Sequence, residues 1–281
     1  MKISFIVLTY NRADALLAVL ASLSRQCDEG HEVLIADDGS RPEQVRMVLS
    51  ECPAFKCPVH HVWHPDAGFT AARCRNLAAA RASGDYLVFL DGDCVPNKDF
   101  AARHTSLAEK GCFVNGSRLL LSENLSQRAI EGDVFLPGCS AAFWLNARLR
   151  GDSNKLLHLL PWPWRLFRVK QRFDWRGIRS CNFGVWKKDF VAVNGFDEVF
   201  SGWGHEDADL VLRLSHAGVL RKNGFMAIEV FHLWHPENKR DQEAGNKRLV
   251  LQRMTTHIIL AQRGLRELDP GSPVQVTPLH Q

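Results

Sequence analysis

The sequence predicts an α/β protein built on one mostly parallel sheet. Short apolar runs alternate with amphipathic segments through about the first ninety residues, which is the order of strands and helices that a parallel sheet requires. The chain has 281 residues, 46% of them hydrophobic and 23% charged, so it can close one large core or two small ones. A polar cluster follows each of the first four apolar runs, where ligands bind in such sheets.

The N-terminal elements can be assigned in chain order. Strands are predicted at residues 4–8, 32–36, 59–63 and 86–90, because each is a short apolar run that ends in a polar turn. The helix after the first strand carries Leu16, Leu17, Leu20 and Leu23 on one face, with Asn11 or Asp14 as its N-cap. Residues 43–51 have helical character, and Thr70 can cap an alanine-rich helix that reaches Ala82.

The C-terminal elements are less regular. A helix is predicted to start at Glu206 and to stop at Gly218, with Leu210, Leu212, Leu214 and Ala217 facing inward. A strand is predicted at 226–231. A docked helix is predicted at 240–263, followed by a frayed end rich in proline and glycine.

The polar clusters are the main functional signal. They are Thr9-Tyr10-Asn11-Arg12, Asp37-Asp38-Gly39-Ser40, the segment 64–69 and Asp91-Gly92-Asp93. Each alone is an ordinary turn, but four at one edge of a sheet predict a site. Asp91 and Asp93 repel each other unless a cation or water lies between them, so a positive charge is expected there. The sequence has no G-x-G-x-x-G after the first strand and no G-K-[ST], so dinucleotide and P-loop sites lose their support.

Charge and cysteine content exclude some classes of protein. A net charge of +4 is too small for a dedicated nucleic-acid binder. The eight cysteines are scattered, and the start MKISFIVLTYNR is a strand rather than an apolar leader, so a cytoplasmic protein with reduced thiols is expected. No apolar stretch has transmembrane length. Cys52 and Cys57 have no second pair at the spacing of a zinc site.

As a set, LTYNR, ADDGS, GFTAARCRNLAAARASGDYLVFLDGDC and SGWGHEDADL resemble the family 2 nucleotide-sugar glycosyltransferases. The resemblance covers residues 1–115 and 180–236. The last motif is also similar to the C-terminal segment of β-1,4-galactosyltransferases and bacterial chondroitin-type polymerases. The GT-A fold is thereby implied, a single mixed and mostly parallel sheet flanked by helices, with a Rossmann-like N-terminal half. The implied organisation is one domain, 1–265, with a nucleotide-binding half 1–115, an insert 119–180, an acceptor and catalytic half 181–236 and a flexible tail 266–281.

The resemblance implies a UDP-sugar donor. Its binding residues would be Thr9, Tyr10, Asn11, Arg12, Asp38, Gly68, Arg73, Asp91 and Gly92. Asp38 would accept from the base, and Arg73, with Asn76 on the same helix face, would meet the diphosphate or the acid cluster. Asp91 and Asp93 correspond to the DxD motif that holds Mn²⁺ or Mg²⁺. His232 is implied as a further metal ligand, with His235 as the alternative metal or phosphate contact, and histidine favours Mn²⁺.

The same resemblance assigns catalytic roles. Asp207 would take the proton from the acceptor hydroxyl, Glu206 would orient a sugar, and transfer would invert the anomeric centre. Asn182, Trp203 and Gly204 would contact acceptor or sugar, with Trp203 as a lid, a core tryptophan being the alternative reading. Ala208 stands where the galactosyltransferases have a third acid, which puts a GlcNAc-type acceptor in doubt.

The insert is the least family-like part. Aromatic and basic residues interleave at 156–176, which fits either a peripheral contact with the inner face of the cytoplasmic membrane or a lid on the acceptor side. Residues 238–240 could form a flap over the diphosphate. The implied function is a metal-dependent inverting hexosyltransferase acting on a glycan or lipid-linked glycan of lipopolysaccharide, O-antigen or capsule. Alternatives are a silent sugar-nucleotide or glycan-binding module and a nucleotidyltransferase.

Overall fold

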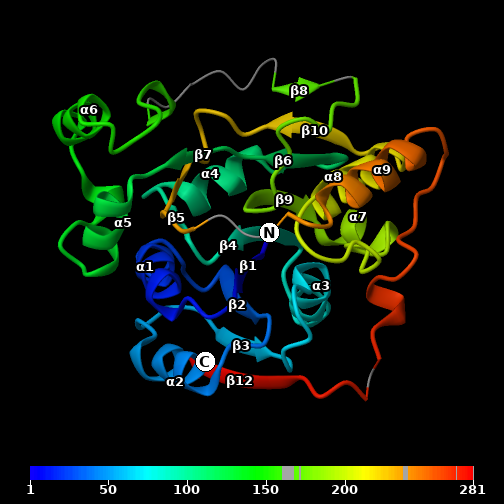
Figure 1. Cartoon of the computed structure of the whole chain (residues 1–281), viewed down its shortest axis with the longest axis horizontal. Helices are drawn as coiled ribbons and strands as arrows, with labels where there is room; N and C mark the ends of the chain where they lie inside the picture. The colour runs from blue at the N-terminus through cyan, green and yellow to red at the C-terminus, as the bar shows by residue number, and fades with distance from the viewer. Residues whose placement is uncertain (160–167, 171, 237–239, 270, 281) are drawn as a thin grey trace.

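A computed structural model of the chain describes residues 1–281 except 160–167, 171, 237–239, 270 and 281. Within the described residues, the main sheet has nine strands in the order β12-β3-β2-β1-β4-β9-β6-β10-β8, and a second sheet has the order β5-β11-β7 (Figure 1). Helices flank the large sheet. The predicted α/β fold on a large mixed sheet is confirmed.

The N-terminal half is a parallel β-α unit. Its strands are β1 (Ile3–Thr9), β2 (His31–Asp37), β3 (Val59–Trp63) and β4 (Tyr86–Asp91), joined by α1 (Ala13–Leu23), α2 (Pro42–Glu51) and α3 (Ala71–Arg81). The register pairs Thr9 with Asp37 and Leu8 with Asp91. Because parallel strands end at the same edge, the turns after them meet there.

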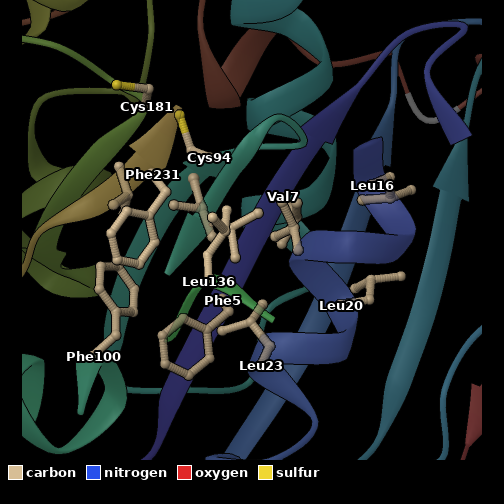
Figure 2. Packing of buried hydrophobic residues seen from close by; sticks show 14 of the residues in the cluster. Phe5, Val7, Leu16, Leu20, Leu23, Cys94, Phe100, Leu136, Cys181 and Phe231 are labelled. Atoms are coloured by element: carbon tan, nitrogen blue, oxygen red, sulfur yellow. The ribbon is translucent and has the colours of Figure 1, made fainter. Parts of the chain in front are cut away.

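Helix α1 packs its leucine face on β1. Leu16, Leu20 and Leu23 are buried against Phe5 and Val7 (Figure 2). Leu17 is partly exposed, at the side of this face.

The predicted caps of the first helix are wrong. Arg12 is the N-cap, without a side-chain hydrogen bond. Asn11 has a φ of 52°, and its side-chain oxygen accepts from the Arg41 N–H at 2.9 Å instead. Asp14 lies inside the first turn and pairs with Arg12. Thr70 is the N-cap of α3, but its side chain caps no helix N–H.

The second half extends the sheet. β9 (Asn182–Trp186) runs antiparallel to both β4 and β6 (Cys112–Asn115), and β10 (Leu220–Asn223) pairs with β6 and with β8 (Val169–Lys170). The helices of this half are α4 (Phe100–Leu107), α7 (Lys187–Ala192) and α8 (Glu206–His216). Helix α8 buries Leu210, Leu212 and Leu214 and stops before Gly218, whose φ is 80°. Ala217, predicted to face inward, is exposed because the helix has already ended.

The small sheet pairs β11 (Val230–His232) with β5 (Cys94–Pro96) and β7 (Arg118–Leu120). The strand predicted at 226–231 therefore starts four residues late. The cause is Met226, which has a φ of 56° and donates its N–H to the Glu229 side chain at 2.7 Å. This sheet brings Cys94–Pro96, which follow β4 closely, next to Val230–His232, far along the chain.

Residues 123–159 of the insert form an arm at one side of the molecule (Figure 1). It contains α5 (Glu123–Ile130), a 3-10 turn η1 (Leu136–Gly138), α6 (Ala141–Leu149) and a 3-10 turn η2 (Leu157–Leu159). Trp144 of α6 stacks on Phe231 of β11 with ring centroids 4.7 Å apart, which fastens the arm to the small sheet. Of the aromatic and basic run at 156–176, residues 160–167 and 171 lie outside the described residues.

The C-terminal part differs from its prediction. The helix expected at 240–263 is α9 (Glu243–Arg253), and Ile258, Ile259 and Leu260 beyond it are exposed. After a 3-10 turn η3 (Leu265–Glu267), β12 (Gln275–His280) pairs antiparallel with β3. The prediction of a frayed tail over 266–281 is wrong for residues 275–280, because β12 pairs with the backbone of β3, with one irregularity between Pro278 and His280.

Candidate active site

The DxD acids lie at the end of the fourth strand. Asp91 closes β4, and the N–H of Gly92 donates to the Leu8 carbonyl at 2.7 Å. A Cβ at position 92 would lie 2.8 Å from that carbonyl oxygen, so only glycine fits this turn. The turn is therefore tied to β1, and it presents Asp91 and Asp93 at the edge where the polar clusters meet.

Two histidines face Asp93. His235 Nε2 lies 3.3 Å from Asp93 Oδ2, and His232 Nε2 lies 3.9 Å from Asp93 Oδ1. The two imidazole rings have centroids 5.2 Å apart. Burial lowers the pKa of His232, although Asp93 raises it, so the neutral, metal-binding form is favoured at pH 7. Carboxylate and imidazole donors at this spacing fit Mn²⁺.

Arg75 connects the DxD motif to the second half of the site. Its Nη2 donates to Asp91 Oδ1 at 2.8 Å, and its Nη1 donates to Glu206 Oε1 at 3.2 Å. Only 3% of this side chain is exposed. Burial opposes the charge, but Asp91 and Glu206 outweigh it and raise the pKa of Arg75. Asp91, at the end of β4, and Glu206, at the start of α8, are thus joined by a single guanidinium group.

Sequence reasoning selected Arg73 in place of Arg75. Arg73 lies on another face of α3, where it bonds Glu198 at 3.3 Å and the Ser272 hydroxyl at 2.8 Å. Asn76 bonds the backbone of Phe196. The available signal was the alanine-rich, buried character of α3, because an arginine inside such a helix needs acidic partners.

Asp207 lies in the first turn of α8, beside Glu206. Its carboxylate accepts from the Ala208 N–H at 2.7 Å and from the Ser180 N–H at 3.3 Å. Burial, followed by the charge of Glu206, raises the pKa of Asp207 to about 7. A carboxylate with a near-neutral pKa is well suited to accept a proton at physiological pH.

The loop before α8 carries Trp203. Gly202, Gly204 and His205 all have positive φ, and Asn246 of α9 donates to the carbonyls of Ser201 at 3.1 Å and Gly204 at 2.9 Å. The guanidinium carbon of Arg240 lies 4.7 Å from the centre of the Trp203 ring. Trp203 is only partly buried, so it is not a core tryptophan. Of the flap expected at 238–240, residues 238 and 239 lie outside the described residues.

The turns after β1, β2 and β3 form the other side of the site. The Tyr10 hydroxyl donates to Asp66 Oδ2 at 2.9 Å, and the Gly68 N–H donates to Asp66 Oδ1 at 2.9 Å. Asp38 lies beneath them, accepting from the Thr70 N–H at 3.0 Å and also from the Thr70 hydroxyl. Thr9, Asn11 and Arg12 belong to the same group of turns, since the Asp38 N–H donates to the Thr9 carbonyl and the Asn11 N–H to the Ser40 hydroxyl.

The side chain of Asn182 does not reach the site formed by the DxD acids and the Glu206-Asp207 pair. Its side chain is fully buried and donates to the carbonyls of Ser117, at 3.1 Å, and Ile228. A neighbouring cavity of about 400 Å³ lies by the N-terminus of α3, not by the DxD acids, and is lined by His64, Phe69, Thr70, Arg73, Phe200 and Arg263. The structure therefore brings together the residues of the DxD motif, the two histidines, Arg75 and the Glu206-Asp207 pair.

Two protein-family models match different parts of the chain. Residues 4–138 match the model of glycosyl transferase family 2, and residues 166–233 match the model described as the N-terminal domain of galactosyltransferase. Chondroitin synthase of Escherichia coli is 26% identical over 267 residues, which cover 86% of this chain and 36% of that protein. The chain spans 29% to 52% of the length of the first three relatives.

Solved structures share the fold. TarS residues 1–349 of S. aureus in complex with UDP-GlcNAc has a TM-score of 0.56 and 14% identity, over 95% of this chain and 69% of that one. The mannosyltransferase PcManGT of Pyrobaculum calidifontis, in complex with GDP-Man and Mn²⁺, has a TM-score of 0.53 and 16% identity, over 84% and 58% of the two chains. The chain has the GT-A fold and belongs to the family 2 glycosyltransferases, with a galactosyltransferase-type segment in its second half.

Proposed function

We propose that this chain transfers a sugar from a UDP-sugar to a hydroxyl group of a glycan or lipid-linked glycan, with inversion and with a divalent metal ion. The observation that carries the proposal is the Arg75 bridge between Asp91 and Glu206. This bridge brings the DxD motif close to Asp207, whose carboxylate has a pKa of about 7. The donor is UDP-galactose, UDP-glucose or a UDP-N-acetylhexosamine. Solved relatives with UDP-GlcNAc or Mn²⁺ bound support these choices.

Asp93 and His232, with His235 and Asp91 beside them, would hold the metal ion, Mn²⁺ in preference to Mg²⁺. The ion would offset negative charge on the diphosphate. Asp207 takes the proton from the acceptor hydroxyl, and Arg75 holds the Glu206 carboxylate in place next to it through an ion pair. Trp203 covers the bound sugar from a loop that α9 holds in place.

Assays with a panel of UDP-sugar donors test this function. Incubating the protein with each UDP-sugar and Mn²⁺ should release UDP from one donor, and a chelator should stop the release. Asp93→Ala removes the acid that both histidines face, so UDP release should fall at least about 100-fold and Mn²⁺-dependent UDP affinity should weaken. Asp99→Ala, on the exposed N-terminal side of α4, is the matched control and should change neither.

The same panel separates the alternatives. A sugar-nucleotide binding module would bind UDP with Mn²⁺ but release nothing from any donor, with or without acceptor glycans. A nucleotidyltransferase would release pyrophosphate from UTP. Either result would replace the transferase proposal.

We also propose that α6 touches an anionic membrane surface, which would place the acceptor among lipid-linked glycans of lipopolysaccharide, O-antigen or capsule. Leu145, Leu149 and Leu157 are 51%, 79% and 66% exposed, and Arg148 and Arg150 are exposed beside them. Residues 141–180 hold nine of the 35 basic residues and two of the 31 acidic ones. Apolar side chains with a basic rim suit the interface of an anionic bilayer. No described helix is long and apolar enough to span a membrane.

Vesicle sedimentation tests whether α6 binds an anionic membrane surface. The protein should pellet with vesicles rich in phosphatidylglycerol and stay in the supernatant with phosphatidylcholine alone. A double change, Leu145→Ser with Leu149→Ser, should reduce the bound fraction several-fold, because each buried methylene contributes about 0.8 kcal/mol. Leu251→Ser, equally exposed on α9 at 47%, is the control. Equal sedimentation of the double variant and the unchanged protein would contradict the proposal.

A further inference from the structure

Arg118 lies in the small sheet next to a candidate metal ligand. β7 and β11 are parallel, with Arg118 opposite Val230 and Leu120 opposite His232. Side chains alternate along a strand, so Arg118 and His232 leave the sheet on the same face. The intervening row, Leu119 and Phe231, points the other way into the core. Arg118 therefore shares the face of the sheet that carries His232.

The Arg118 guanidinium has no partner among the described residues. No hydrogen bond or ion pair of its side chain is present there, although the residue is partly buried. The buried Arg75 and Arg213 each have acidic partners, since Arg75 bonds two carboxylates and Arg213 bonds Asp209 at 2.7 Å. A partly desolvated guanidinium with five free N–H donors is unfavourable unless an anion accepts hydrogen bonds from it.

The charged groups around Arg118 include both DxD acids. Burial opposes its charge, but Cys181, Cys94, Asp91 and Asp93 raise its pKa, and Arg118 in turn lowers the pKa of His232. The preceding corner is fixed by the buried Asn182, whose side chain donates to the Ser117 carbonyl at 3.1 Å and whose carbonyl accepts from the Gly116 N–H at 2.9 Å. A Cβ at Gly116 would lie 2.2 Å from Asn182 Nδ2, so this packing depends on glycine.

We propose that Arg118 binds an oxyanion of the substrate beside the DxD acids, and that Asn182 positions it for this by holding the Gly116-Ser117 corner. The oxyanion is either the diphosphate of the donor or the carboxylate of an acidic sugar. A planar guanidinium matches both, because two parallel N–H groups meet two oxygens. The inference rests on the proposed function and adds a residue that selects the charge of its substrate.

Calorimetric titration of the Mn²⁺-loaded protein with UDP, UDP-glucose and UDP-glucuronate distinguishes the two sources. If the diphosphate is bound, Arg118→Gln should weaken all three ligands about 10-fold or more. If a sugar carboxylate is bound, UDP and UDP-glucose should be unaffected, and UDP-glucuronate, or a glucuronate-ended acceptor in a KM measurement, should lose about 10-fold. Arg118→Lys should recover part of the affinity but not the bidentate geometry.

Arg46→Gln, the same change at an exposed position of α2, is the control and should match the unchanged protein. If Arg118→Gln equals Arg46→Gln for every ligand and for the acceptor KM, the inference is overturned. If the unchanged protein binds no UDP with Mn²⁺, the proposed function fails first, and the two failures are thereby distinguished.

Discussion

Asp207→Asn should reduce sugar transfer on the order of 10²–10⁴-fold while leaving the affinity for UDP with Mn²⁺ unchanged. The side chain sits at the start of α8, and its carboxylate is anchored by two backbone N–H groups. Asparagine keeps the shape but cannot accept the proton of an attacking hydroxyl. Single-turnover transfer with saturating donor, together with UDP titration, separates the two effects. Unchanged turnover in Asp207→Asn would exclude this carboxylate as the base.

The pH dependence provides an independent check. Asp207 accepts a proton only when ionised, so kcat/KM should rise about tenfold per pH unit below its pKa of about 7 and level off above it. Glu206→Gln removes a neighbouring negative charge that raises this pKa, so the midpoint should move to lower pH. A profile that is flat between pH 5 and 8 would contradict the assignment.

Asp207 should also limit stability. Because its pKa is raised in the folded state from 3.8 to about 7, the folded protein favours the protonated acid, and stability falls as pH rises between about 4 and 7. Asp207→Asn cannot ionise, so its melting temperature should exceed that of the unchanged protein at pH 8. At pH 4 the two should be similar.

Arg75→Met should have the largest effect on folding among the residues of the site. The substitution leaves Asp91 and Glu206 facing each other without a counter-charge, and removing one partner of a buried ion pair typically costs about 3–5 kcal/mol. For a chain of this size the melting temperature should fall on the order of 10 °C. Thermal unfolding followed by circular dichroism measures the change.

Arg73→Met is the matched control two residues away. Its side chain is 21% exposed and has one acidic partner among the described residues, so a loss of about 1 kcal/mol is expected. Equal melting temperatures for the two variants would show that the Arg75 bridge adds nothing. If Arg75→Met retains activity, its kcat/KM profile should shift to higher pH, because Arg75 lowers the pKa of Asp207.

The sequence predicted the fold well where the pattern was local. The first four strands appear where apolar runs end in polar turns, and the DxD acids follow the fourth as expected. The same holds for α8, in which Leu210 and Leu214 lie four residues apart on one helix face and whose end is marked by Gly218. The family resemblance supplied the roles of these residues, which local pattern alone could not.

Features that depend on distant contacts were missed. Arg73 and Arg75 look alike in the sequence, and only the packing of α3 decides which one meets Asp91 and Glu206. Asn182 was assigned to the acceptor because it opens a family motif, yet it fixes a turn 65 residues away. The pairing of β12 with β3 could not be predicted either, because any extended segment can complete an open sheet edge.

That last pairing also affects how copies of the protein meet. Without β12, β3 would present its unpaired amide and carbonyl groups to solvent, and a second copy could add its own strand there. The C-terminal segment occupies that row itself. The outermost strand on that side is then β12, whose Pro278 has no N–H to donate to an added strand, so the flank away from the arm that contains α5 and α6 is a poorer template for polymerisation.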